Sequence, residues 1–265
     1  MGDRIPRMIR SAVLPASPAT EADDGGPRIN IRLTVAFLAL AVGAVIAASF
    51  SAALALIQAG ATRTDLAAGV EQISRVTKFL LKFDAGGEQT VTAWLSSMIL
   101  LLCSMVLYYI ASMQRQRGDG YAWHWLGLSI IFCGLSMDEA VGVHEMAIDP
   151  MRELFDASGI FLYAWVIPAL AFVALVGIAY LGFLRHLEPS FRLRFLVAGA
   201  LFAGAAIGFE MVEGALAEFY LEHRLIHEIA VHLEDATEFA GELVFLHALL
   251  LYARRYDPRM VVRLT

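Results

Sequence analysis

Six long apolar stretches divide the chain, and polar connections separate them. A helix that crosses a bilayer needs about 20 mostly apolar residues, and each stretch supplies them. The pattern therefore predicts an all-α polytopic membrane bundle of about six transmembrane helices, within a membrane domain over residues 32–253. The predicted spans are 32–57, 91–113, 122–141, 160–184, 193–213 and 229–252.

The segments around these spans carry weaker patterns. Residues 1–31 are rich in Pro, Gly and charged residues, which predicts a disordered cytoplasmic arm. Residues 254–265 form a predicted cytoplasmic tail. In the connection after the first span, apolar residues recur every three or four positions from Leu66 to Phe83, so we predict an amphipathic helix over residues 64–83 on the outer membrane interface.

The composition excludes an ordinary soluble protein. Hydrophobic residues make up 58% of the chain and charged residues 17%, whereas soluble domains are about half apolar and a quarter charged. The net charge of -6 offers no basic face to nucleic acid. The first partner is therefore a lipid bilayer. Cys103 and Cys133 both fall inside apolar runs and predict no disulfide framework.

Lys and Arg are distributed unevenly between the connections. The N-terminal arm, the second–third and fourth–fifth connections and the tail hold 14 of them, and the other three connections hold 6. This bias predicts that both termini are cytoplasmic. In a bacterium the host membrane would be the inner, or plasma, membrane.

Many acidic residues lie in or beside the predicted spans, where charged side chains are unfavourable. Ten of the 26 Asp and Glu lie in or beside the third, fifth and sixth predicted spans, where Lys and Arg are nearly absent. A charge near the bilayer centre costs about 2.5–3.5 kcal/mol. The carboxyls must therefore be protonated, bound to cations or exposed to a water-filled cavity. Alternating helix directions would place all three acidic stretches at one depth, on the outer side.

Carboxylates with one or two imidazoles suit Zn, Fe(II) or Mn. In the sixth span, helical geometry places five side chains in one sector of roughly 120°: Glu228, His232, Asp235, Glu238 and Glu242. We therefore predict a divalent-metal site. The candidate ligands are Asp138, His144, Glu145, Glu210, Glu213, His232, Asp235, Glu238 and Glu242, supported by Glu139, His227, Glu228 and Glu234.

Several alternatives remain open. The carboxyls could instead be protonated and hydrogen-bonded to one another, and His124 and His247 could ligate a haem. A metal site would suit an enzyme acting on a lipid-like or small apolar substrate. The same acids would also suit a proton- or cation-coupled transporter, and a structural subunit of a membrane complex is the third interpretation. No Ser-His-Asp spacing or phosphate-binding loop is visible.

Two short segments resemble those of a known group. The stretch Leu135–Ala140 with His144-Glu145 is similar to a segment of uncharacterised bacterial multi-pass membrane proteins, and Glu234–Phe239 resembles part of their last helix. The resemblance implies a multi-pass fold and assigns no catalytic role. In the fifth span, the small residues Ala200, Gly204 and Gly208 predict close helix contact and a possible oligomer.

Overall fold

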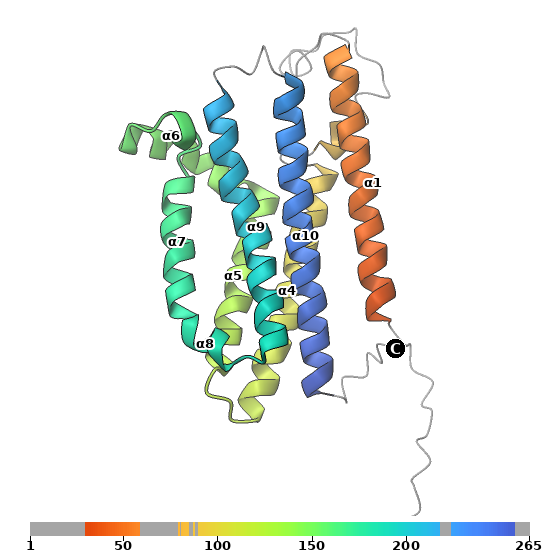
Figure 1. Ribbon diagram of the computed structural model, residues 1–265, viewed down its shortest axis with the longest axis vertical. Coiled ribbons are helices and arrows are strands. Elements are labelled where there is room, and N and C mark those ends of the chain that lie inside the picture. The colour runs from red at the N-terminus through yellow and green to blue at the C-terminus, as the bar shows by residue number, and fades with distance from the viewer. Residues whose placement is uncertain are drawn as a thin grey trace, which may run out of the picture.

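The computed structural model describes residues 30–58, 79, 81–84, 87, 90–217 and 224–257 of the 265, and this part is an all-α bundle (Figure 1). Most of the predicted arm, of the 64–83 helix and of the tail lies outside the described residues. The elements are α1 (Ile31–Gln58), η1 (Leu81–Phe83), α4 (Val91–Gln116), α5 (Ala122–Val141), α6 (Val143–Phe155), η2 (Gly159–Phe161), α7 (Val166–Ala179), α8 (Leu181–His186), α9 (Pro189–Leu216) and α10 (Arg224–Tyr256).

The long helices alternate in direction. In Figure 1, α1, α5 and α9 run upward, while α4, α7 and α10 run downward. Helix α6 projects sideways from the bundle near the top left of this view, so we call this the upper end of the bundle and the opposite end the lower end. The alternation is what successive membrane crossings require, and it brings segments far apart in sequence to the same height.

The predicted spans differ in how well they match the helices. Four helices, α1, α4, α9 and α10, are long and apolar enough to cross a membrane. A fifth crossing exists if α5 and α6 count as one span bent by 83°. The predicted span 160–184 is divided into η2, α7 and α8. With 14 residues, α7 reaches about 21 Å, short of a hydrocarbon layer of about 30 Å.

Helix α7 ends at Ala179, and Tyr180 follows it outside helical geometry (φ -95°, ψ 2°). The Tyr180 hydroxyl donates a hydrogen bond to the backbone carbonyl of His124 at 2.9 Å. The hydropathy of the 25-residue run from 160 to 184 carries no information about this hydrogen bond. Hydropathy alone therefore predicted one continuous span.

Two reciprocal serine pairs join α4 to α5. The Ser97 hydroxyl donates to the Ser136 carbonyl at 2.7 Å, and the Ser136 hydroxyl donates back to the Ser97 carbonyl at 2.8 Å. Ser104 and Ser129 repeat the exchange at 2.8 and 2.9 Å. Small hydroxyl side chains allow close helix approach and satisfy one another in an apolar medium. The four bonds fix the antiparallel register of this helix pair.

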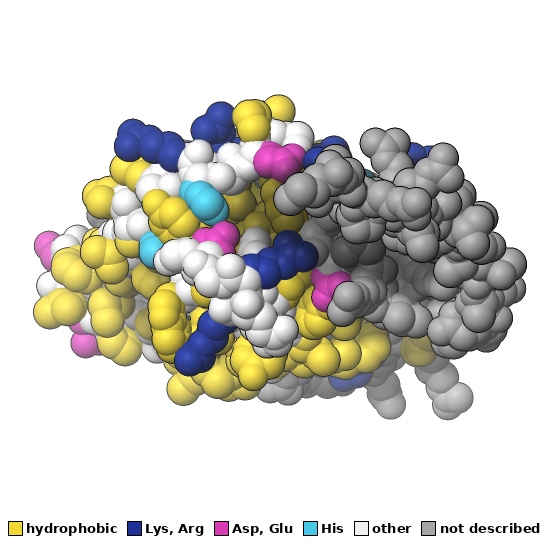
Figure 2. All heavy atoms as spheres, turned by 90° about the horizontal axis from the view of Figure 1, so that it is seen from below, with side chains coloured by type: hydrophobic (Ala, Val, Ile, Leu, Met, Phe, Trp, Pro, Cys, Tyr) yellow, Lys and Arg dark blue, Asp and Glu magenta, His cyan; other side chains and the backbone are white. Residues whose placement is uncertain are grey.

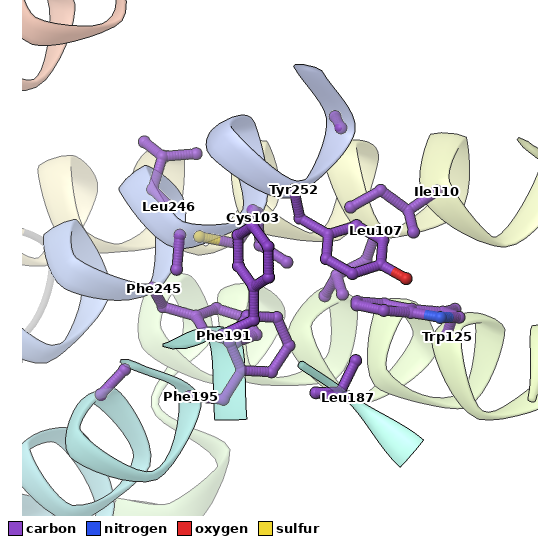
Figure 3. Packing of buried hydrophobic residues seen from close by; sticks show 14 of the residues in the cluster. Cys103, Leu107, Ile110, Trp125, Leu187, Phe191, Phe195, Phe245, Leu246 and Tyr252 are labelled. Carbon is purple, nitrogen blue, oxygen red and sulfur yellow. The ribbon is translucent and has the colours of Figure 1, made fainter. Parts of the chain in front are cut away.

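The lower half of the bundle is an aromatic and aliphatic core (Figure 3). Trp125 of α5 is completely buried, and its ring packs on Tyr252 of α10 at 4.6 Å and edge-on against Phe195 of α9 at 5.8 Å. Cys103 lies within this core, whereas Cys133 is exposed on the outside of the bundle. The core ties α4, α5, α9 and α10 together below the acidic residues.

The lower end is polar and basic. Figure 2 shows several Lys and Arg side chains on this end, with hydrophobic side chains around them. Hydrogen bonds tie the end of α10 to its neighbours here: Gln114 donates to Tyr252 at 2.5 Å, Tyr109 donates to Asp257 at 2.8 Å, and Arg117 donates to the Tyr256 carbonyl.

A glycine in α10 sets the distance between α9 and α10. A Cβ at Gly241 would lie 2.7 Å from the backbone N of Phe202 and 2.9 Å from the carbonyl O of Ala198. The small-residue stripe predicted to make close contact behaves differently. A Cβ at Gly204 or Gly208 meets nothing within 4 Å, so these two glycines make no close contact with the described part of the chain, and the proposed role of the stripe in an oligomer stays a prediction.

Gly241→Ala should destabilise the protein. The added methyl meets backbone atoms that cannot move aside without separating two helices, and overpacking of this kind costs about 1–3 kcal/mol. Gly204→Ala is the matched control, because its methyl enters open space and alanine favours a helix by about 1 kcal/mol over glycine. Thermal unfolding in detergent should therefore show a lower midpoint for Gly241→Ala only. Equal midpoints for the two variants would contradict the close contact.

Candidate functional site

The upper half of the bundle holds acidic side chains from three helices. Glu139 lies near the upper end of α5, Glu210 and Glu213 near that of α9, and Asp235 and Glu238 in the upper half of α10. The helix directions alone bring these positions to similar heights. We call the set formed by Glu139, Glu210, Glu213, Glu234, Asp235, Glu238 and Glu242 the carboxyl cluster.

The members of the carboxyl cluster repel one another. Glu238 interacts with the charges of Asp235, Glu139, Glu242 and Glu210, in decreasing order. Glu234 in turn interacts with Glu238 most strongly and then with Glu213. Since Coulomb repulsion grows as the dielectric falls, these groups cannot all carry a charge without a cation among them.

Glu242 forms the floor of the cluster. Its side chain is 2% exposed, Oε1 accepts a hydrogen bond from the Ser96 hydroxyl at 2.6 Å, and Oε2 has no hydrogen-bond partner among the described residues. The next buried side chains down α10 are Phe245 and Leu246 of the apolar core. A buried carboxyl oxygen without a partner is costly, so this oxygen marks a place where a ligand or proton would be stabilised.

Neither Lys nor Arg occurs in the helix segments that carry the cluster, residues 122–141, 195–216 and 225–253. The predicted metal ligands are nonetheless not assembled as a coordination site: within the part of the chain that the structure describes, no three His, Cys, Asp or Glu side chains are grouped so that they could hold a metal ion. Binding a metal would require the carboxyls to turn toward one another.

His144 and Asp138 form a tight pair at the turn between α5 and α6. Gly142 adopts a left-handed conformation there (φ 70°), and the chain bends by 83° between the two helices. Asp138 Oδ1 accepts the backbone N–H of His144 and Oδ2 lies beside His144 Nδ1, both at 2.8 Å. Asp138 thus satisfies a free N–H at the start of α6.

The pKa of His144 is raised from its ordinary value. Burial by itself would lower the pKa, but the hydrogen bond and charge of Asp138 outweigh burial, and Glu210 and Glu139 add to the effect. The imidazole also packs on the Trp165 ring at 4.9 Å. His144 is therefore the imidazole that lies nearest to Glu210 and Glu139, at the edge of the carboxyl cluster.

His232 faces a different helix. Its Nε2 lies 2.9 Å from the Ser49 hydroxyl of α1, and its Nδ1 lies 2.6 Å from the backbone carbonyl of Glu228. Both of its nitrogens are thus engaged away from the carboxyl cluster. The sector of 120° predicted for α10 is wide enough to contact two different helices: His232 contacts α1 and Glu242 contacts α4. Residues in one sector therefore need not share one site.

The remaining predicted residues are more peripheral. Glu145 is exposed on α6, although its charge reaches Glu210. Glu228 is 3% exposed and His227 is half-buried, near the start of α10. All of them lie at the upper end, but none is in the carboxyl cluster.

The two predicted haem ligands have different surroundings. The His124 ring lies 4.9 Å from that of Tyr121 and 5.3 Å from that of Tyr180. His247 lies near the charges of Arg194 and Arg32. Aromatic packing accounts for the position of His124, and haem binding stays a prediction.

Sequence reasoning missed three residues that contact the predicted ones. Ser49 and Ser96 bond to His232 and Glu242, and Trp165 lies beside His144. Ser49 and His232 are 183 residues apart, and neither spacing nor hydropathy marks them as neighbours.

A family model described as Domain of unknown function (DUF8692) matches residues 32–253, which is most of the chain. The chain belongs to this family. The match includes the whole carboxyl cluster, Ser49 and His232. No curated protein and no solved structure matches the chain.

The Asp138–His144 pair predicts a pH-dependent stability. Because the pKa of His144 is raised in the folded state, its ionic contact stabilises the protein below the ordinary histidine pKa of about 6.5 and is lost as the pH rises through the raised value. Asp138→Asn keeps an acceptor for the His144 N–H but removes the charge. Its unfolding midpoint should therefore lie below that of the wild type at low pH, with the gap closing as the pH rises.

Asp149→Asn is the control for this measurement. Asp149 is 84% exposed and pairs with Arg152 on the same helix at 3.1 Å, and such surface pairs contribute little. A gap for Asp138→Asn that is independent of pH, as expected for Asp149→Asn, would show that the charge of Asp138 does not act on His144.

Proposed function

We propose that this membrane protein binds a divalent metal ion, Zn, Fe(II) or Mn, in the carboxyl cluster. The observation that carries the proposal is Glu242, a buried carboxyl whose Oε2 has no hydrogen-bond partner among the described residues and whose charge interacts with those of Glu139 and Asp235. Oxygen donors of this kind favour hard or borderline divalent ions. A cation would relieve the repulsion within the cluster.

The ligands would come from several helices. Asp235, Glu238 and Glu242 of α10 would supply oxygens on one wall, Glu139 of α5 and Glu210 of α9 would supply the others, and His144, whose charge interacts with those of Glu210 and Glu139, would add a nitrogen. Helix bundles hold metals with inward carboxylates on facing helices, and these side chains would have to turn toward one another to do so. A bound metal would activate water or oxygen for chemistry on a lipid-like or small apolar substrate.

Proton- or cation-coupled transport by the same carboxyls has less support. A relay must reach both sides of the membrane, but below Glu242 the buried side chains of α10 are apolar from Phe245 to Leu249. The carboxyl cluster is thus closed on its lower side in this conformation, which suits a binding or catalytic site better than a pathway.

Metal content should depend on the floor of the cluster. After loading with Zn, Fe(II) or Mn and removal of excess ion, elemental analysis of the detergent-purified protein should give about one or two ions per chain. Glu238→Gln combined with Glu242→Gln should lose most of that metal, because amides replace charged ligands at equal size.

Glu153→Gln removes a carboxylate from the exposed surface of α6 and should keep the full metal content. The double variant should also stay folded, since removing buried charges is often stabilising. Metal content unchanged in a folded double variant, or no metal in the wild type after loading, would refute the proposal.

We also propose that the lower end faces the cytoplasm of a cell whose plasma, or inner, membrane holds the protein. Basic residues close three helices at this end: Arg115 in α4, Arg185 in α8, and Arg254 and Arg255 in α10. Such residues remain on the cytoplasmic side. A green fluorescent protein fused to the C-terminus should fluoresce, whereas alkaline phosphatase at the same position should be inactive. Active phosphatase would reverse the orientation.

A further inference from the structure

A serine and a histidine meet inside the bundle, on the side of α10 that faces α1. The Ser49 hydroxyl lies 2.9 Å from His232 Nε2, and the two side chains belong to residues that are 1% and 6% exposed. Across the ring, His232 Nδ1 lies 2.6 Å from the Glu228 carbonyl oxygen. Both residues lie within long helices, which hold them in place.

The carbonyl of Glu228 determines how the imidazole is protonated. A carbonyl oxygen only accepts hydrogen bonds, so Nδ1 must carry the hydrogen. In the neutral imidazole, Nε2 then has a free lone pair and accepts the hydrogen of the Ser49 hydroxyl. A hydroxyl, a base and a group that orients the base are the three parts of an activated nucleophile.

We propose that Ser49 is a nucleophile, with His232 as its general base, for acyl-ester substrates that reach it from the membrane. This inference is independent of the metal proposal. His232 bonds to Ser49 and to the Glu228 carbonyl, and neither contact involves the carboxyl cluster. The inference names a second site, in the α1–α10 seam.

The surroundings favour an apolar acyl substrate. The Phe50 ring packs edge-on against the His232 ring at 5.1 Å. On α10, Ile229 and Leu233 are 41% and 52% exposed and lie on the outer surface of the bundle, within one turn of His232. The pair therefore lies just beneath an apolar surface, and movement of Phe50 would admit an acyl chain from the bilayer.

The reaction balances with water as the second reactant. Ser49 Oγ bonds to the ester carbonyl carbon while its proton passes to His232 Nε2. The bond from that carbon to the alcohol oxygen breaks, and the alcohol leaves with the proton from Nε2. Water then gives a proton to Nε2 and bonds to the same carbon, and Ser49 leaves and regains its proton. The products are a carboxylic acid and an alcohol.

The other buried serines show what a structural role looks like. Ser97, Ser104, Ser129 and Ser136 donate to backbone carbonyls. Among the described serines, Ser49 alone is hydrogen-bonded to an imidazole. Both arrangements satisfy a polar group, but only a base can raise the reactivity of the hydroxyl, and reactivity can be measured.

The test is covalent labelling with a long-chain alkyl fluorophosphonate, which reacts with activated serines. Incubation with the full-length protein in micelles should add one label per chain, and peptide mapping should place it on Ser49. Ser49→Ala should abolish the label. His232→Gln should slow labelling by at least about 100-fold, the usual contribution of a general base.

Ser97→Ala is the matched control, because it removes a buried hydroxyl that has no imidazole partner, and it should label as the wild type does. A wild-type chain that is folded but unlabelled, or labelled at another residue, would overturn the proposal, and this result does not depend on any variant folding. Labelling should also persist in Glu242→Gln, so failure of the metal proposal and failure of this one are distinguishable.

Discussion

The structure depends on the cost of gathering carboxyl groups inside an apolar bundle. Residues 122–141, 195–216 and 225–253, which carry these groups, contain neither Lys nor Arg, so the charges must be offset by protonation or by a cation that these segments do not supply. The rest of the upper half follows from this need. Ser96 donates to Glu242, and Asp138 is paired with His144, so each of these two carboxyls has a polar partner beside it.

The lower half shows the opposite chemistry and makes the upper half possible. Trp125, Phe195 and Tyr252 hold α5, α9 and α10 together through ring contacts. This core provides the stability against which polar groups can be buried above it. It also places a packed apolar layer beneath Glu242, between the carboxyl cluster and the polar lower end.

Hydropathy predicted the helices well where composition alone decides them. Helix α5 runs from Ala122 to Val141, as expected, because its boundaries coincide with changes in polarity. The single span predicted over 160–184 was wrong, because contacts such as the one at Tyr180 interrupt an apolar run without changing its composition. That His232 contacts α1 could not be predicted for a related reason. Helix α10 has 33 residues and packs on α1, α4 and α9, and helical periodicity cannot show which of these helices a given side chain contacts.

The paired serines between α4 and α5 have a mechanical consequence. Ser97 and Ser104 are seven positions apart, and so are Ser129 and Ser136. Sliding α4 along α5 by less than seven residues would therefore break all four hydrogen bonds together. Helices α9 and α10 are similarly locked by the backbone contact at Gly241. Glu139 belongs to the first of these helix hairpins and Glu238 to the second, so any movement of one hairpin against the other would change the distance between these carboxyls.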